Sequence, residues 1–457
     1  MGEGEPHRVR HPGDRRLPEG LHGLRCSRPE ASAARPGHPG GDLVRPHVRP
    51  EQSVPKVGGR LDSLTGLRWW AALLVFGEHI SALKLGTRVG ADERGPADEV
   101  LHFFFGTGTI GVSCFFILSG FVLAWTYRPD TDTVRRFWQR RFAKIYPVYL
   151  VSTVLAFVLF AGMGQAPSVA NVALHLTLLQ SWVPDQGLYF GLNPVTWSLS
   201  CEAFFYLAMP LLFLWLRRSG VRTLYLVIGA AVALSLVLPY TLGALVDLPY
   251  PATEMIPTGP VGGPFAYWFT YVFPGFRVLE FAAGVAAALL VRRQAWRGPS
   301  VAWSLVICLA GWAVNQQLPP RLQHEAGTFL PFVMLMAALA VADLQGRWSP
   351  LRGRRMRFLG EISYCLYVFQ LLLLAVVADV LRPALAAAGV LADKEAALPG
   401  WLVGPAVLGC LALCSLAAWA AYRWVEVPMM RRLRPRVMRP DGTGPVAPAT
   451  VSARMPA

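Results

Sequence analysis

Long apolar runs are the feature that most constrains the fold of this chain. An α-helix needs about twenty apolar residues to cross the hydrocarbon core of a bilayer. The chain has 457 residues, 54% of them hydrophobic, and a mean hydropathy of +0.39, which is more apolar than soluble domains. We therefore predict an all-α, polytopic membrane protein. The apolar windows are 67–83, 108–126, 147–163, 196–216, 224–245, 268–291, 301–315, 328–342, 359–381 and 401–423.

The distribution of Lys and Arg predicts how these windows are oriented. Basic clusters follow the second, fourth, sixth, eighth and tenth windows, whereas the loops between them hold few basic residues. Cytoplasmic loops are enriched in Lys and Arg, so the alternation predicts ten membrane-spanning helices around an interior cavity, with both termini cytoplasmic. A shorter apolar stretch, 172–183, fits only if it lies at the outer interface or re-enters, because a crossing there would invert every later loop.

The two ends of the chain differ in composition from the part between them. Residues 1–60 are rich in Arg, Pro and Gly and contain no apolar core segment, which predicts a disordered basic cytoplasmic tail or a start codon assigned too early. Residues 434–457 predict a second disordered cytoplasmic tail, which leaves 61–433 as the membrane domain. Much of the net charge of +15 lies in the first tail and in the loops, and it does not indicate a nucleic-acid partner.

The seven cysteines indicate neither a disulfide framework nor a metal site. Cys26 lies in the first tail, and the other six lie in apolar segments rather than in predicted outer loops, where disulfides would be favoured. No CxxC or Cys/His spacing suggests zinc. We predict no metal and no resident cofactor.

Three ionisable residues stand in the first apolar window, and two of them, Arg68 and His79, share a helix face, while Glu78 points about 100° away from His79. Arg68 and His79 are eleven residues apart, about three turns of an α-helix, so both side chains project from nearly the same face about 16 Å apart along the axis. A charged group near the bilayer centre costs at least ~2.5 kcal/mol. Because of this cost, the pair predicts a functional role. His79 would be a proton-transfer group deep in the membrane, and Arg68 would be a fixed cation nearer one surface.

Further ionisable residues occur in the fourth and sixth windows. Counting from the start of the fourth window places Glu202 one to two turns below the outer surface, roughly level with His79. Arg277 and Glu280 lie in the middle of the sixth window at a spacing that allows an ion pair. Each residue also has a structural interpretation, as a hydrogen-bonded histidine, a packing carboxylate or a structural ion pair. Their recurrence favours a shared interior cavity.

These residue types suit one class of reaction. Histidine titrates near neutrality, so it can accept a proton from a hydroxyl nucleophile and return it to a leaving group. Arginine presents a permanent, bidentate cation that suits phosphate. A donor that is phosphorylated, cytoplasmic and acylated fits both features, and acyl-CoA meets these requirements. The transfer would pass through a tetrahedral oxyanion that needs stabilisation.

Six segments carry a resemblance to a known family, the integral-membrane acyltransferase family 3. This family includes O-acetylases of surface polysaccharides and macrolide 3-O-acyltransferases. The resemblance spans residues 61 to about 433. No single motif is specific for the family, but the occurrence of all six in the same order is specific. The segments are 61–68 with the Arg-x10-His spacing, 111–121, 140–147, 197–202 (Trp-Ser-Leu-x-x-Glu), 360–367 and 425–428.

The resemblance implies an acyl-CoA donor bound from the cytoplasmic side, an O-acyl product, and essential roles for Arg68 and His79. Two positions depart from the family pattern. Lys144 stands where the basic motif usually has a second arginine, so bidentate phosphate recognition is lost there. Gln370 stands where the late motif usually ends in histidine, and an amide cannot shuttle a proton.

The sequence thus predicts an O-acyltransferase of the plasma membrane with acyl-CoA as co-substrate. We predict that His79, oriented by Glu202 or a neighbour, is the base. The donor is expected to bind among Arg68, Arg141, Lys144 and Arg277. A transporter or flippase is the alternative, although no inverted repeat supports it. The acceptor remains open between a surface glycan and a macrolide, glycolipid or other secondary metabolite.

Overall fold

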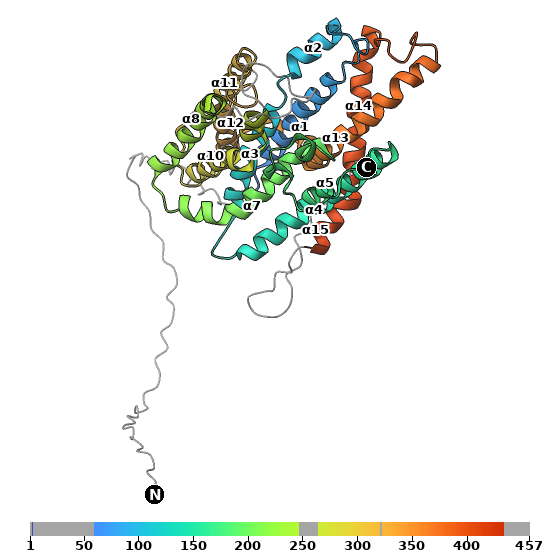
Figure 1. Ribbon diagram of the computed structural model, residues 1–457. Coiled ribbons are helices and arrows are strands. Elements are labelled where there is room, and N and C mark those ends of the chain that lie inside the picture. Colours follow the sequence, from blue (N-terminus) through green and yellow to red (C-terminus); the bar gives the residue numbers. More distant parts are fainter. Residues whose placement is uncertain (1, 3–58, 246–263, 320–321, 434–457) are drawn as a thin grey trace, which may run out of the picture. The chain divides into compact units, whose positions relative to one another are not determined.

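The computed structural model describes residues 2, 59–245, 264–319 and 322–433, and the helices belong to one compact unit, Pro55–Ala457. The predicted tails, 1–60 and 434–457, therefore lie outside the described residues except at positions 2, 59 and 60. Within the described part every regular element is helical, which confirms the all-α prediction (Figure 1).

Nine of the ten apolar windows fall on one long helix each, and the sixth, 268–291, is divided between the short element η3 (Trp268–Val272) and the long helix α10 (Pro274–Arg292). These helices are α1 (Asp62–Ala82), α3 (Ile110–Thr126), α4 (Val134–Gly162), α7 (Trp197–Leu216), α8 (Val221–Leu245), α10 (Pro274–Arg292), α11 (Val301–Asn315), α12 (Phe329–Leu344), α13 (Arg354–Ala387) and α14 (Gly400–Ala421). The remaining short elements are α2 (Pro96–Phe105), α5 (Val169–Leu176), η1 (Gln180–Trp182), α6 (Gln186–Tyr189), η2 (Pro194–Thr196), α9 (Pro264–Tyr267), η3 (Trp268–Val272), η5 (Pro350–Arg352), η6 (Tyr422–Glu426) and α15 (Val427–Leu433).

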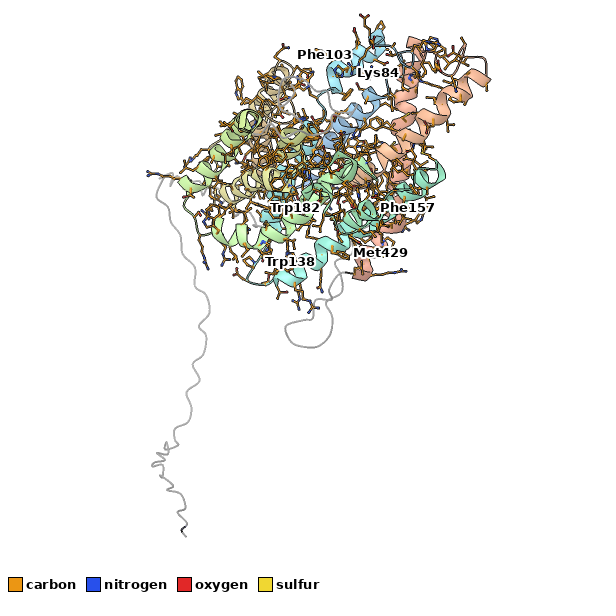
Figure 2. All side chains as sticks on the ribbon, viewed as in Figure 1. Lys84, Phe103, Trp138, Phe157, Trp182 and Met429 are labelled. Atoms are coloured by element: carbon orange, nitrogen blue, oxygen red, sulfur yellow. The ribbon has the colours of Figure 1, made fainter. Side chains whose placement is uncertain are left out.

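Length and composition suit a membrane crossing in seven helical segments of the described chain. The helices α11 and α12 are shorter, at 15 and 16 residues. The helix α1 has 21 residues, but Arg68, Glu78 and His79 reduce its apolar character. Large apolar side chains also cover the outside: Trp138 and Phe157 of α4 lie at the periphery and are each 40% exposed (Figure 2). The chain is a helical membrane protein, while ten crossings and the orientation of the termini stay predictions.

Two close helix pairs form the centre of the unit. Glycines bring α3 and α10 together, because a Cβ atom at Gly120 would lie 2.0 Å from the Phe281 carbonyl oxygen and one at Gly284 would lie 2.1 Å from that of Ile117. In the same way, Gly360 lets α13 approach α1, since a Cβ atom there would lie 1.8 Å from the Thr65 carbonyl oxygen. Small residues permit such contacts where apolar lipid gives helices little reason to associate.

The stretch 172–183 does not form a membrane-spanning helix. Ser168 caps α5, its hydroxyl accepting from the Asn171 N–H at 3.2 Å, but α5 has only eight residues before Thr177. At 1.5 Å per residue this is about 12 Å, too short to cross. His175 and Gln180 are nevertheless fully buried. One face of the segment therefore packs against the protein, while Leu176 and Leu179 are 38% and 48% exposed. Its position at the outer interface or as a re-entrant segment stays a prediction.

Candidate active site

A pocket between α1, α3, α4, α7 and α13 brings together four of the six predicted site residues. These are Arg68 from α1, Arg141 and Lys144 from α4, and Glu202 from α7. Apolar side chains of α3 form one wall, among them Phe115, Phe116 and Val122. The lining also includes these uncharged polar residues: Ser119, Ser198, Tyr206, Tyr364 and Tyr367.

Glu202 lies with Arg68 rather than with His79, the residue with which sequence counting placed it level. It shares the pocket with Arg68, and its Oε2 accepts a hydrogen bond from the Tyr206 hydroxyl at 2.7 Å. Counting assumed that α7 begins at the outer surface. The residues before α7 are instead buried, with Val195 at 3% exposure and Thr196 at 0%. The helix therefore starts inside the protein, and Glu202 is placed with the cation at the start of α1.

Lys144 is held by a buried carboxylate far along the chain. Its ammonium forms an ion pair with Glu426, which is 0% exposed and also accepts from the Cys365 thiol at 3.3 Å. Glu426 ends the π-helical turn η6, and this turn carries its carboxylate toward α4. The Lys144 charge is thus partly compensated where it lines the pocket, and the segment 425–428 acts on the site through this pair.

The two arginines of the pocket differ in their surroundings. Arg68 is half-buried, and its Nε is buried without a hydrogen-bond partner in the described part of the chain. The Arg141 guanidinium lies 5.8 Å from the centre of the Phe137 ring, within cation–π distance. Both side chains line the pocket, and a guanidinium suits an anion there.

His79 lies three turns beyond Arg68 on α1 and is not among the residues that line the pocket. It is half-buried, and its Nδ1 is buried with no hydrogen-bond partner within the described ranges. The hydrogen bond that the Glu202 carboxylate accepts comes from Tyr206 rather than from His79. The role of His79 as base, and the orienting role of Glu202, stay predictions.

Arg277 belongs to a separate, fully buried ion cluster. Its guanidinium contacts Glu325 and also Glu280, whose Oε2 is 3.0 Å from Nη2, and it donates to the Ser113 hydroxyl at 3.0 Å. The ring of Tyr271 lies 5.6 Å away. The three charged side chains are 0%, 2% and 5% exposed. Arg277 does not line the pocket, and its predicted contact with the donor stays untested.

Replacing Arg277 with alanine should destabilise the protein by about 3–5 kcal/mol, because it leaves two buried carboxylates without their counter-ion. The measurement is the melting temperature and yield of the purified variant in detergent. A triple variant, Arg277→Met with Glu280→Gln and Glu325→Gln, removes all three charges and should recover most of the loss. A stable Arg277→Ala protein with only a weakened affinity for acetyl-CoA would instead favour a donor contact.

Sequence reasoning missed several lining residues. Tyr206 could have been found, because it stands four residues after Glu202 on a predicted helix and so on the same face. Tyr364 and Tyr367 lie in the recognised segment 360–367 but carried no charge to draw attention. The Tyr367 hydroxyl is 2.7 Å from the Ser198 hydroxyl and donates to the Val195 carbonyl at 2.9 Å, which fastens α13 to the start of α7. Among the described residues no His, Cys, Asp or Glu cluster could hold a metal ion.

Comparison with known proteins identifies the family of the chain. The family model described as an acyltransferase domain matches residues 61–422. The acyltransferase MdmB of Streptomyces mycarofaciens is 37% identical over 401 residues, which cover 86% of this chain and 97% of that protein. The putative acetyltransferase ORF330 of Acidianus two-tailed virus is 25% identical over 273 residues, 59% of this chain and 74% of that protein.

The O-acetyltransferase OatA of Staphylococcus aureus is 27% identical over a shorter stretch of 156 residues. This stretch covers 30% of this chain and 26% of that protein. No solved structure matches the chain significantly. The family model covers most of the chain, and MdmB is 37% identical over nearly its whole length, so this membrane protein is an acyltransferase and belongs to the acyltransferase 3 family.

Proposed function

We propose that this acyltransferase takes its acyl group from acyl-CoA and transfers it to a hydroxyl of a carbohydrate or a glycosylated polyketide. The pocket carries the proposal: Arg68, Arg141 and Lys144 line one space, and Arg68 shares a helix with His79. A phosphorylated donor needs cations, and a hydroxyl acceptor needs a base. The helix α1 supplies one of each about 16 Å apart along its axis, at 1.5 Å per residue.

The charge balance of the pocket favours an anionic donor. Among its lining residues three cations face one carboxylate, Glu202. A guanidinium binds phosphate through two parallel N–H groups, whereas an ammonium acts as a point charge. Because only a guanidinium offers this bidentate geometry, we assign the phosphates of CoA first to Arg68 and Arg141, and we give Lys144, which is paired with Glu426, a supporting role. Arg277 is enclosed by its own carboxylates, and we leave it out of the donor site.

The proposed chemistry uses His79 as a general base and then as a general acid. The imidazole takes the proton of the acceptor hydroxyl while the oxygen attacks the thioester carbonyl carbon. The carbonyl electron pair moves onto oxygen and forms an oxyanion. When this intermediate collapses, the C–S bond breaks, the new C–O bond remains, and His79 returns the proton to the departing sulfur. The products are an O-acyl ester and the free thiol of CoA.

The order in which we propose to test acceptors rests on how much of each relative the chain covers. The match to MdmB extends over 97% of that protein, while the match to OatA covers 26%. We therefore propose to test hydroxyl-bearing secondary metabolites first and surface glycans second. In both cases we place the enzyme in the plasma membrane, where a cytoplasmic thioester can reach the pocket.

Thiol release separates this function from transport without chemistry. Purified protein in detergent is incubated with acetyl-CoA and, in separate reactions, with macrolide lactones carrying free hydroxyls and with glycan oligomers. We expect free CoA thiol together with a product heavier by one acetyl group, detected by mass spectrometry. A protein that binds an acceptor but releases no thiol with any of them would be a transporter or flippase, and the proposal would fail.

A further inference from the structure

Gln370 has a buried amide side chain and no role in the proposed chemistry described above. It lies in α13, it is 0% exposed, and both its Nε2 and its Oε1 lack a hydrogen-bond partner within the described residues. Burying an amide without partners costs free energy, and native proteins satisfy nearly all such groups. A buried side chain with both polar ends unsatisfied, on a helix that lines the pocket, is able to bind a polar group of a substrate.

The packing of α13 against α1 fixes the depth of Gln370. Arg357 pairs with Asp62 at 3.2 Å, and Arg382 donates to the Thr87 carbonyl at 3.0 Å; the residues of each pair are 295 positions apart. The two helices therefore run parallel in one register, which sets Gln370 level with Val75. At 1.5 Å per residue, the amide lies about 10 Å beyond the level of Arg68 and about 6 Å short of that of His79.

Gln370 also lies on the side of α13 that leads from the pocket. It follows Tyr367 by three residues, a spacing that puts both side chains on neighbouring positions of one helix face. Tyr367 lines the pocket, and its ring packs 5.8 Å from that of Phe115. Gln370 therefore lies one turn further along α13 than a residue that lines the pocket, at a level between those of Arg68 and His79.

We propose that Gln370 is a catalytic residue whose Nε2–H donates to the carbonyl oxygen of the thioester and stabilises the oxyanion. The inference rests on the proposed function, which places the phosphates near Arg68 and the attacking hydroxyl near His79. The reacting carbon must then lie between these two levels, where Gln370 stands. The amide gains and loses no proton: it only donates a hydrogen bond, which strengthens as negative charge develops on the carbonyl oxygen.

Gln370→Met tests this role, because methionine has a similar size but no donor. We expect kcat for acetyl transfer, measured by thiol release with the best acceptor, to fall by about 10²–10³-fold, the effect of losing one oxyanion donor. The KM values should change less than about threefold, because the contact strengthens in the transition state. The melting temperature should stay the same or rise, because an unsatisfied polar group is replaced by an apolar one.

Two further variants complete the experiment. Gln370→His keeps an N–H donor and should retain kcat within about tenfold of the wild type, since one donor replaces another. Gln345→Met changes an exposed glutamine at the end of α12 and should behave as the wild type. A Gln370→Met kcat within about threefold of the wild type would overturn the proposal, and so would a loss confined to the KM of the acceptor. A wild-type protein that releases no thiol would overturn the proposed function as well, so the two failures are distinct.

Discussion

His79→Ala should lower the rate of acyl transfer by about 10²–10⁴-fold, the usual contribution of a general base. The acceptor hydroxyl is a weak nucleophile, and no other histidine lies on α1 to take its proton. The loss should appear in kcat, because the imidazole acts on the reacting hydroxyl rather than on the CoA phosphates. The measurement is thiol release from acetyl-CoA by purified wild-type and variant proteins with the same acceptor.

His102 provides the matched control for this substitution. It lies on α2, the next helix along the chain, and its side chain is exposed. His102→Ala should keep wild-type activity and melting temperature. Near wild-type transfer by His79→Ala would refute the assignment of the base, and an equal loss in both variants would show that the decrease is not specific to His79.

The helices were predictable because each window is long and apolar enough to be recognised from its own sequence, without knowledge of its neighbours in the fold. The main exception is the sixth window, in which the π-helical turn η3 ends at Val272 and α10 begins at Pro274. A proline at the first position of a helix is favourable, because its missing N–H would have had no partner there. The sequence contains Pro274 at this break, but the apolar residues continue on both sides of it, so hydropathy alone does not reveal the break.

The depth of Glu202 was not predictable in the same way. Its position depends on how far the segment before α7 enters the protein, and contacts with distant residues set that depth. The Tyr367 hydroxyl binds the Val195 carbonyl across 172 positions, and the Asn193 amide donates to the Val368 carbonyl at 2.9 Å. Such contacts leave no local pattern, so counting residues from a presumed surface put Glu202 at the level of the wrong group.

The partners of the charged residues show the same limit. The spacing of Arg277 and Glu280 indicated an ion pair, and the structure confirms it at 3.0 Å. Glu325, the second carboxylate of that cluster, comes from a segment 48 positions further along, and Lys144 finds Glu426 across 282 positions. Local spacing therefore identified the cations of the chain but could not say which of them are already neutralised.

Arg68→Ala should lower kcat/KM for acetyl-CoA by about 10²–10³-fold, with most of the change in KM. Removing one partner of a buried, charge-assisted contact costs about 2–5 kcal/mol, and each 1.4 kcal/mol is a factor of ten. Arg68→Lys should recover part of the affinity, because it keeps the charge but loses the bidentate geometry. The measurement is the dependence of thiol release on acetyl-CoA concentration.

A donor without phosphates tests whether Arg68 acts on the CoA phosphates or only supports the fold. An S-acetyl pantetheine fragment has the same thioester and lacks those charges. The wild type should prefer acetyl-CoA strongly, whereas Arg68→Ala should use the two donors with nearly equal kcat/KM, because the interaction that distinguishes them is gone. An equal loss of activity toward both donors would assign Arg68 to the structure of the pocket. In that case Arg141, which lies beside the same wall, would be the remaining arginine for the phosphates.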